Sequence, residues 1–196
     1  MLSLVGDNAA LDERTEQLIA VANEQGFPFW GAQGTIYRGW VMVKNGDVAQ
    51  GLSLLRSSSS AYRATGAFLL AAAACEIAGQ IEEAVALLDD ALQIAERTGE
   101  RWSAAELNRH KGQLLLRQGH SEAAEELYLK ALSIAEEQGA KLWELRAAAS
   151  LARLRRDQGC FAEARDLVAP VYDWFTEGFD TPDLKDAKAL LDELNA

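Results

Sequence analysis

The chain has 196 residues, of which 49% are apolar and 25% are charged, a composition typical of a globular protein. Its net charge of −11 opposes binding to nucleic acid or to an anionic membrane, because both surfaces are themselves negative. The longest apolar stretch, near residues 68–74, is far shorter than the roughly 20 residues of a membrane-spanning helix, and the start MLSLVGDN lacks a signal peptide's features, so we expect a cytoplasmic protein.

Helices separated by glycines recur along the whole chain. One series of glycines follows the first helix of each pair, at Gly46, Gly79, Gly119 and Gly159, and a second series ends the other helices, at Gly26, Gly66, Gly99, Gly139 and Gly178. A glycine just past a helix end can take the left-handed conformation that closes the helix, and Asp47 or Ser121 can cap the helix that follows. Periods of 33 to 40 residues predict a solenoid of helical pairs.

We therefore expect one all-α domain over residues 1–196, a right-handed α-solenoid of four helical pairs. Its elements are a half-repeat at 8–26, repeats at 27–66, 67–99, 100–139 and 140–178, and a capping helix at 181–195. The first helix of the 67–99 repeat, AFLLAAAACEIA, is seven residues shorter than its counterparts. Seven residues are nearly two helical turns, so the apolar face keeps its direction and we expect the stacking to continue.

A recurring set of small residues predicts how the helices of each pair dock. Gly112 on a first helix is followed by Ala124, Tyr128 and Ala131 on one face of the second. We call these four the docking positions; in the other repeats they hold Gly39, Gly51, Leu55 and Ser58, then Ala72, Ala84, Leu88 and Ala91, then Ala152, Ala164, Val168 and Val171. This pattern resembles the tetratricopeptide repeat (TPR), lengthened to about 40 residues. The family's Trp and Tyr anchors are not at their usual places, and Trp30, Trp102 and Trp143 instead lie near the starts of first helices.

The two ends of the array differ. The half-repeat at 8–26 lacks a preceding helix, so we interpret it as a cut through a longer array, expect Leu11, Leu18 and Ile19 to be partly uncovered, and predict a homodimer through this end. At the other end, Thr181 is expected to cap a helix that has Pro182 in its first turn. Pro170 should kink the preceding helix, predicted at residues 161–175.

From about Phe27 onward the chain resembles a narrower group, on strings such as NEQGFPFWGAQGTIYRGW, ERTGERWSAAELNRHKGQLLL and LVAPVYDWFTEGFDTPDLKDAKALLDEL. That group is the C-terminal TPR-like region of large bacterial proteins that join a class III adenylate/guanylate cyclase domain to an AAA-type (STAND) ATPase. Arg155 stands where we would expect tryptophan. The resemblance implies a sensor or regulatory role, and its catalysis would belong to other domains.

The sequence supplies no catalytic set. A phosphate-binding loop needs a Gly-Lys pair, which the chain lacks, and a two-metal cyclase site needs paired aspartates on a sheet. His120 stands beside Glu122, Glu125 and Glu126, but acidic residues at a helix start follow from the helix dipole and need no metal. Cys75 and Cys160 fit no metal or redox spacing. The RSSSS string at 56–60 is expected within a helix, without the strand-turn-helix setting of an activated serine, so we expect neither an enzyme nor a cofactor.

The inner face of the first helices is the predicted binding surface for a protein or peptide. Carrying the register through the repeats gives what we call the groove positions: Gln33, Ile36, Trp40, Lys44, Leu69, Glu76, Arg109, Gln113, Arg117, Arg146, Arg153 and Arg156. They change from apolar and aromatic at the N-terminal end to arginine-rich at the C-terminal end.

Two interpretations of the five arginines stay open. They could grip the carboxylates of an acidic peptide whose apolar anchor lies near Trp40, or they could pair with acidic residues of the chain itself. Two other functions also stay open. The chain could sense a small molecule at the apolar end of the groove, or it could be a fragment of a cyclase or ATPase whose active site lies in absent domains.

Overall fold

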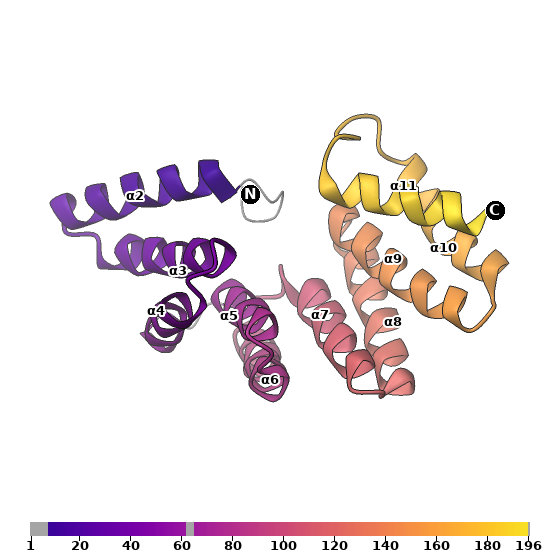
Figure 1. Cartoon of the computed structure of the whole chain (residues 1–196), viewed down its shortest axis with the longest axis horizontal. Helices are drawn as coiled ribbons and strands as arrows, with labels where there is room; N and C mark the ends of the chain where they lie inside the picture. Colours follow the sequence, from indigo (N-terminus) through magenta and orange to yellow (C-terminus); the bar gives the residue numbers. More distant parts are fainter. Residues whose placement is uncertain (1–7, 62–64, 196) are drawn as a thin grey trace. The chain divides into compact units, whose positions relative to one another are not determined.

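The computed structural model describes residues 8–61 and 65–195, and within these ranges it contains ten α-helices and no strand. The expected all-α class is therefore confirmed for the described residues (Figure 1). The helices group into two compact units, which meet in sequence between Glu100 and Arg101. Each unit is described by itself below, and the prediction of one domain over residues 1–196 stays a prediction. No helix among the described residues combines the length and apolar character that a membrane span requires.

The first unit contains five helices. They are α2 (Asn8–Gln25), α3 (Pro28–Lys44), α4 (Val48–Ala61), α5 (Thr65–Ile77) and α6 (Ile81–Thr98). Helix α2 packs on α3, α3 pairs with α4, and α5 pairs with α6 while also touching α3 and α4. Although α5 has 13 residues against the 17 of α3, it stacks on the preceding pair. The expectation that the shortened helix does not interrupt the stacking is met within this unit.

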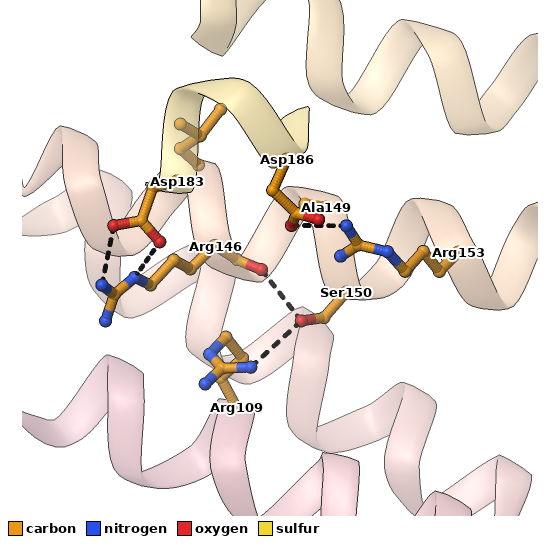
Figure 2. A pocket seen from close by; sticks show the side chains of 8 residues that line it. Arg109, Arg146, Ala149, Ser150, Arg153, Asp183 and Asp186 are labelled. Carbon is orange, nitrogen blue, oxygen red and sulfur yellow. Dashed lines mark hydrogen bonds and ion pairs between the residues drawn. The ribbon is translucent and has the colours of Figure 1, made fainter. Parts of the chain in front are cut away.

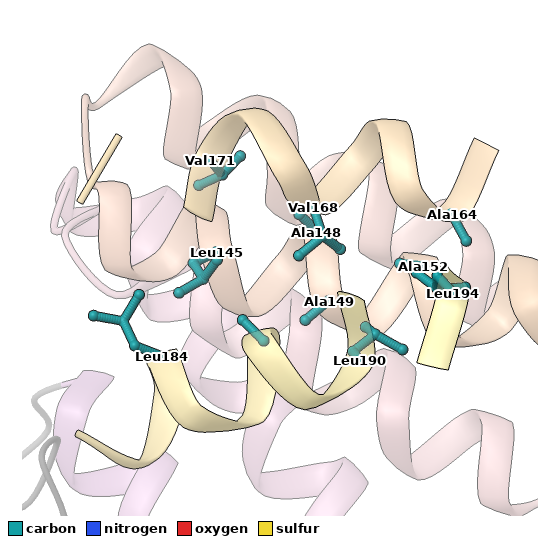
Figure 3. Close-up of a cluster of buried hydrophobic side chains, with 11 residues drawn as sticks. Leu145, Ala148, Ala149, Ala152, Ala164, Val168, Val171, Leu184, Leu190 and Leu194 are labelled. Atoms are coloured by element: carbon teal, nitrogen blue, oxygen red, sulfur yellow. The ribbon is translucent and has the colours of Figure 1, made fainter. Parts of the chain in front are cut away.

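The second unit also contains five helices. They are α7 (Ala104–Arg117), α8 (Ser121–Glu137), α9 (Lys141–Asp157), α10 (Phe161–Asp173) and α11 (Pro182–Leu194). Helix α7 pairs with α8 and α9 with α10, while α9 also packs on α7 and α8. The C-terminal helix α11 lies on both α9 and α10, and its Leu184, Leu190 and Leu194 enter a buried cluster with Leu145 and neighbouring alanines (Figure 3). Apolar burial therefore fixes α11 as the cap of this unit.

The corner glycines behave largely as expected. Those at positions 26, 46, 79, 99, 119, 139, 159 and 178 have φ between 62° and 99°, the left-handed region that an L side chain disfavours. Gly66 was predicted to end a helix, and this is wrong, because it lies in the first turn of α5. The prediction that Ser121 caps a helix is also wrong. Ser121 is the first residue of α8, and the N-cap residue His120 makes no side-chain capping bond.

The docking positions bring the helices of each pair close together. A Cβ atom built on Gly51 of α4 would lie 2.6 Å from the carbonyl oxygen of Gly39 on α3, and one on Gly112 would lie 2.8 Å from Tyr128 Cε1. The alanines at these positions in the later repeats are completely buried. At Gly51 and Gly112 even an alanine methyl would clash, and the later repeats accept nothing larger than alanine at several of these positions, so the small-residue pattern identified in the sequence does position the helix pairs.

The two ends of the array differ in part from expectation. Leu11 was expected to be partly uncovered, but it is 6% exposed because α2 lays its apolar side on α3; Leu18 and Ile19 are half-buried, as predicted. At the C-terminal end, α11 begins as predicted, with Thr181 at the N-cap position and Pro182 at the first helical position, but the Thr181 hydroxyl makes no capping bond and donates to the carbonyl oxygen of Gly178. Pro170 lies inside α10, which ends at Asp173 rather than at residue 175.

Candidate functional site

The second unit contains a cavity of about 200 Å³ on one side of α9. Its wall is made by Arg109 of α7, by residues 145, 146, 149, 150 and 153 of α9, and by Asp183 and Asp186 of α11 (Figure 2). Helix periodicity explains the α9 contribution, because residues three, four and seven apart share one face. Three of the predicted groove arginines, Arg109, Arg146 and Arg153, meet at this cavity.

The arginines of α9 form ion pairs with acidic residues of α11. Arg146 binds Asp183 with both Nε and Nη2, at 2.6 and 2.7 Å, in the two-bond geometry that guanidinium and carboxylate groups favour. Further along the helix, Arg153 Nη2 bonds to Asp186 Oδ2 at 2.5 Å and Arg156 Nη1 bonds to Glu193 at 2.7 Å. Pairing within the chain, one of the two interpretations left open by the sequence, is therefore present in the structure.

These pairs differ in their contact with solvent. The side chains of Arg146 and Asp183 are each 19% exposed, whereas Arg153 is 35% and Asp186 64% exposed. Water screens an exposed pair, so Arg153 with Asp186 and Arg156 with Glu193 contribute little to stability, while the Arg146–Asp183 pair holds α11 more firmly.

A buried ionic group extends this pairing to α7. Glu106 accepts two hydrogen bonds from Arg109, at 2.7 and 2.8 Å, and lies 3.4 Å from Nη1 of Arg146. Burial by itself would raise the pKa of Glu106, but the charges of Arg109 and Arg146 and the hydrogen bonds from Arg109 outweigh it and hold that pKa below its ordinary value. Glu106 therefore stays ionised and connects α7 to α9.

Arg109 forms the part of the cavity wall that comes from α7. Its Nη1 donates to Gln113 at 3.0 Å and to Ser150 Oγ at 3.4 Å, while Ser150 donates to the carbonyl oxygen of Arg146 at 2.9 Å. Burial of Arg109 would lower its pKa, but the carboxylate of Glu106 reverses this effect and raises the pKa above its usual value. The wall thus presents one hydroxyl and fixed guanidinium groups to the cavity.

Arg155, which replaces an expected tryptophan, has a different role. It lies outside the cavity and its Nη2 donates to Glu125 of α8, with Glu163 of α10 at 3.6 Å from Nε. The arginine therefore ties three helices together through charge, where an aromatic ring would do so through apolar contact.

The remaining groove positions lie in separate places. In α3, Ile36 is buried in the core, Gln33 donates to the hydroxyl of Tyr37, and the Lys44 amine lies 5.4 Å from the ring centre of Trp40. Leu69 and Glu76 of α5 are half-buried, as is Gln113, and Arg117 is exposed. Ile36 therefore packs as a core residue, while the others keep some access to solvent.

The acidic partners on α11 did not appear among the sequence-predicted site residues. The signal for them was present, because Asp183 and Glu193 are ten residues apart, like Arg146 and Arg156. The capping helix was predicted from its start signals alone, and its residues were not aligned with those of the preceding first helix. That alignment would have predicted the pairs of Arg146 with Asp183 and of Arg156 with Glu193.

The potential metal ligands remain dispersed. Among the described residues, no three His, Cys, Asp or Glu side chains are grouped as ligands of one ion would be. His120 is exposed at the start of α8, and Glu125 beside it binds Arg155. The structure thus places the HSEAAEE segment at a repeat corner.

Comparisons with known proteins agree with this architecture. Residues 62–137 match the sequence model of the tetratricopeptide repeat family. The chain has a tetratricopeptide-like fold. It is similar to the TPR-like repeats of a putative kinesin light chain from Podospora anserina, with 20% identity, a TM-score of 0.65, and 83% of this chain covering 84% of the other. No curated protein sequence matches significantly.

Two further TPR-like structures show the range of proteins with this fold. BtubC (BKLC) from P. vanneervenii is 16% identical with a TM-score of 0.72, and the match covers 98% of this chain and 89% of that one. A STAND signal-transduction ATPase with a TPR sensor, from Pyrococcus horikoshii, is 16% identical with a TM-score of 0.65. The match spans 83% of this chain but only 26% of the ATPase, so it concerns a part of that protein. At these identities the likeness establishes the fold alone.

Proposed function

We propose that this chain is a non-catalytic module that binds a protein or peptide partner through its first helices. One observation carries the proposal: TPR-like hairpins dock through small buried residues, and this leaves other first-helix side chains accessible. The docking positions are buried, whereas the groove positions Trp40, Lys44 and Arg117 keep access to solvent. TPR folds are generally scaffolds for protein contacts, and the family match at 62–137 supports that role here.

The partner we propose has an apolar anchor and acidic residues. Trp40, with Lys44 5.4 Å from its ring centre, would receive an apolar side chain and a neighbouring carboxylate. Exposed Arg117, and Arg156 with its weakly bound Glu193, would receive further acidic groups. Arg109 and Arg146 already form ion pairs with Glu106 and Asp183, so the partner surface that we propose does not include them.

We further propose that the module senses or relays a signal for a cytoplasmic cyclase or ATPase. Its support is the sequence resemblance to TPR-like regions of such proteins and the structural likeness to a STAND ATPase with a TPR sensor. Because the chain has no phosphate-binding loop of its own, titration with ATP should give no binding signal in calorimetry. Binding of ATP by this chain would contradict a non-catalytic role.

Self-association through α2 is part of the same proposal. Val21 is 53% exposed and Leu18, three residues before it on the same helix face, is half-buried, whereas Ile19 packs toward Gly34 of α3. Val21 and Leu18 therefore leave a small apolar patch on α2. Light scattering of the purified chain should give a dimer mass that Val21→Glu reduces to that of a monomer. A monomer at high protein concentration would remove the dimer from the proposal.

The experiment for partner binding uses a photo-crosslinking amino acid at Trp40 in living cells. The control places it at Leu129 of α8, a second helix, where the side chain is 47% exposed and so more accessible than the half-buried Trp40. A partner crosslinked from position 40 and not from 129 is then purified and titrated. Lys44→Glu and Arg117→Glu should each weaken its binding at least about tenfold, which corresponds to about 1.4 kcal/mol. Equal crosslinking from both positions, or unchanged affinity in both variants, would refute the proposed surface.

A further inference from the structure

We propose that the cavity between α7, α9 and α11 binds a free α-amino acid in its zwitterionic form. This goes beyond the proposed function, since it concerns a small ligand and a site that the partner surface does not include. The charge of the cavity wall, the size of the cavity and the unequal strength of its ion pairs support this ligand.

The cavity wall carries three guanidinium groups, of Arg109, Arg146 and Arg153, and two carboxylates, of Asp183 and Asp186. Glu106 does not line the cavity, but its buried carboxylate, 7% exposed, pairs with Arg109 and Arg146. With Glu106 included the formal charges sum to zero, so a ligand with a net charge gains little from the site as a whole. A zwitterion can make two favourable charge contacts, because its carboxylate can face a guanidinium while its ammonium faces an aspartate. The charge pattern thus favours a ligand that has both charges close together.

The size of the cavity restricts the ligand further. A volume of about 200 Å³ corresponds to about seven water molecules, at roughly 30 Å³ each. Pockets for drug-sized ligands occupy about 300 to 1,000 Å³, so this cavity can enclose only a smaller group. A single amino acid fits.

One ion pair in the wall can exchange partners at little cost. Arg153 and Asp186 meet through Nη2 and Oδ2 and are well exposed, so water already competes with their bond. Opening it would let Arg153 take the ligand carboxylate and Asp186 the ligand ammonium. The two-bond pair of Arg146 and Asp183 is less exposed and stays intact as part of the cavity wall. The hydroxyl of Ser150 lies in the same wall, where it can help to orient the ligand.

The test uses the full chain and ligand-observed NMR with each of the common L-amino acids. Every amino acid is compared with its N-acetyl derivative, which lacks the ammonium, and with its carboxamide, which lacks the carboxylate. At least one amino acid should bind, and each derivative should bind at least about tenfold more weakly, because it loses one of two charge contacts. No binding by any amino acid, or equal binding by both derivatives, would overturn the proposal.

Variants on α9 and α11 locate the site. Arg153→Gln and Asp186→Asn should each reduce affinity at least about tenfold, while Arg156→Gln and Glu193→Gln, which remove a similar pair outside the cavity, should leave it unchanged. Equal losses in both sets would place the ligand elsewhere and overturn the assignment. Crosslinking from position 40 reports on the partner surface independently, so failure of one proposal is distinguishable from failure of the other.

Discussion

Replacing Gly51 with alanine tests how closely α3 and α4 pack. The new Cβ would lie 2.6 Å from the carbonyl oxygen of Gly39 and 2.9 Å from the backbone nitrogen of Val43. Ordinary contacts begin near 3.4 Å, so the two helices would have to separate by several tenths of an ångström around the fully buried Leu55. Overpacking of this kind costs about 1–3 kcal/mol, and alanine's better helix propensity returns about 1 kcal/mol at most.

With the full propensity gain counted, we expect Gly51→Ala to lower the free energy of unfolding by about 0–2 kcal/mol relative to the wild type, or up to about 8 °C in melting temperature for a chain of this size. Relative to a glycine-to-alanine change without a clash, where the propensity gain cancels, the loss should be about 1–3 kcal/mol. The measurement is denaturant unfolding followed by circular dichroism. Gly31→Ala on α3 is the control, because its Cβ would meet nothing nearer than the Cβ of Ala22 on α2, at 3.8 Å, and it should leave stability unchanged or slightly higher. If Gly51→Ala is as stable as Gly31→Ala, the close docking of α3 and α4 is wrong.

Three further predictions concern the second unit. Asp183→Asn leaves the half-buried Arg146 without its two-bond partner and should cost about 1–3 kcal/mol in urea unfolding, whereas Glu193→Gln, at an exposed pair, should cost less than about 1 kcal/mol. The lowered pKa of Glu106 means that its contribution to stability is present above the ordinary glutamate pKa and is lost as pH falls through the lowered value. Urea titrations at decreasing pH should therefore show a steeper loss for the wild type than for Glu106→Gln. Gly119→Ala has open space around its Cβ but a φ of 87°, so a thermal melt should show a loss of about 1 kcal/mol from backbone strain alone.

The helix pairs were predictable because their determinants are local. A glycine at a corner and small residues at fixed spacing depend only on neighbours within one repeat, and Gly112, Ala124 and Tyr128 pack as the pattern requires. Gly66 was misassigned because its position in the periodic series suggested a helix end, although α5 already begins at Thr65. A glycine can match the period of a series without occupying a corner.

The candidate site was only half predictable, because it depends on contacts between repeats. Register placed Arg109, Arg146 and Arg153 on one face, and the cavity brings them together. Their partners were missed for two reasons. First, Asp183 and Asp186 lie on α11, whose role as a cap was inferred from its start signals alone. Second, the strength of each ion pair depends on how far its side chains are buried, and residue spacing does not give this burial.

The ionic group on α7, α9 and α11 changes how the arginines of a first helix are best interpreted. Each such helix has another first helix beside it, so an arginine can face an acidic residue at the same register as readily as it can face a bound peptide. In this chain Glu106 and Arg146 occupy that register on the first helices α7 and α9, Asp183 occupies it on the capping helix α11, and their charges alternate. Because the charges alternate, they neutralise one another and bind the neighbouring helices together. An acidic ligand could reach Arg146 only by breaking these ion pairs.

Charge reversal at Arg146 would place three negative groups side by side and lower the melting temperature, so it cannot serve as a test of partner affinity at unchanged stability. Such a test belongs at exposed positions like Lys44 and Arg117, where a reversal need not disturb the packing of the helices.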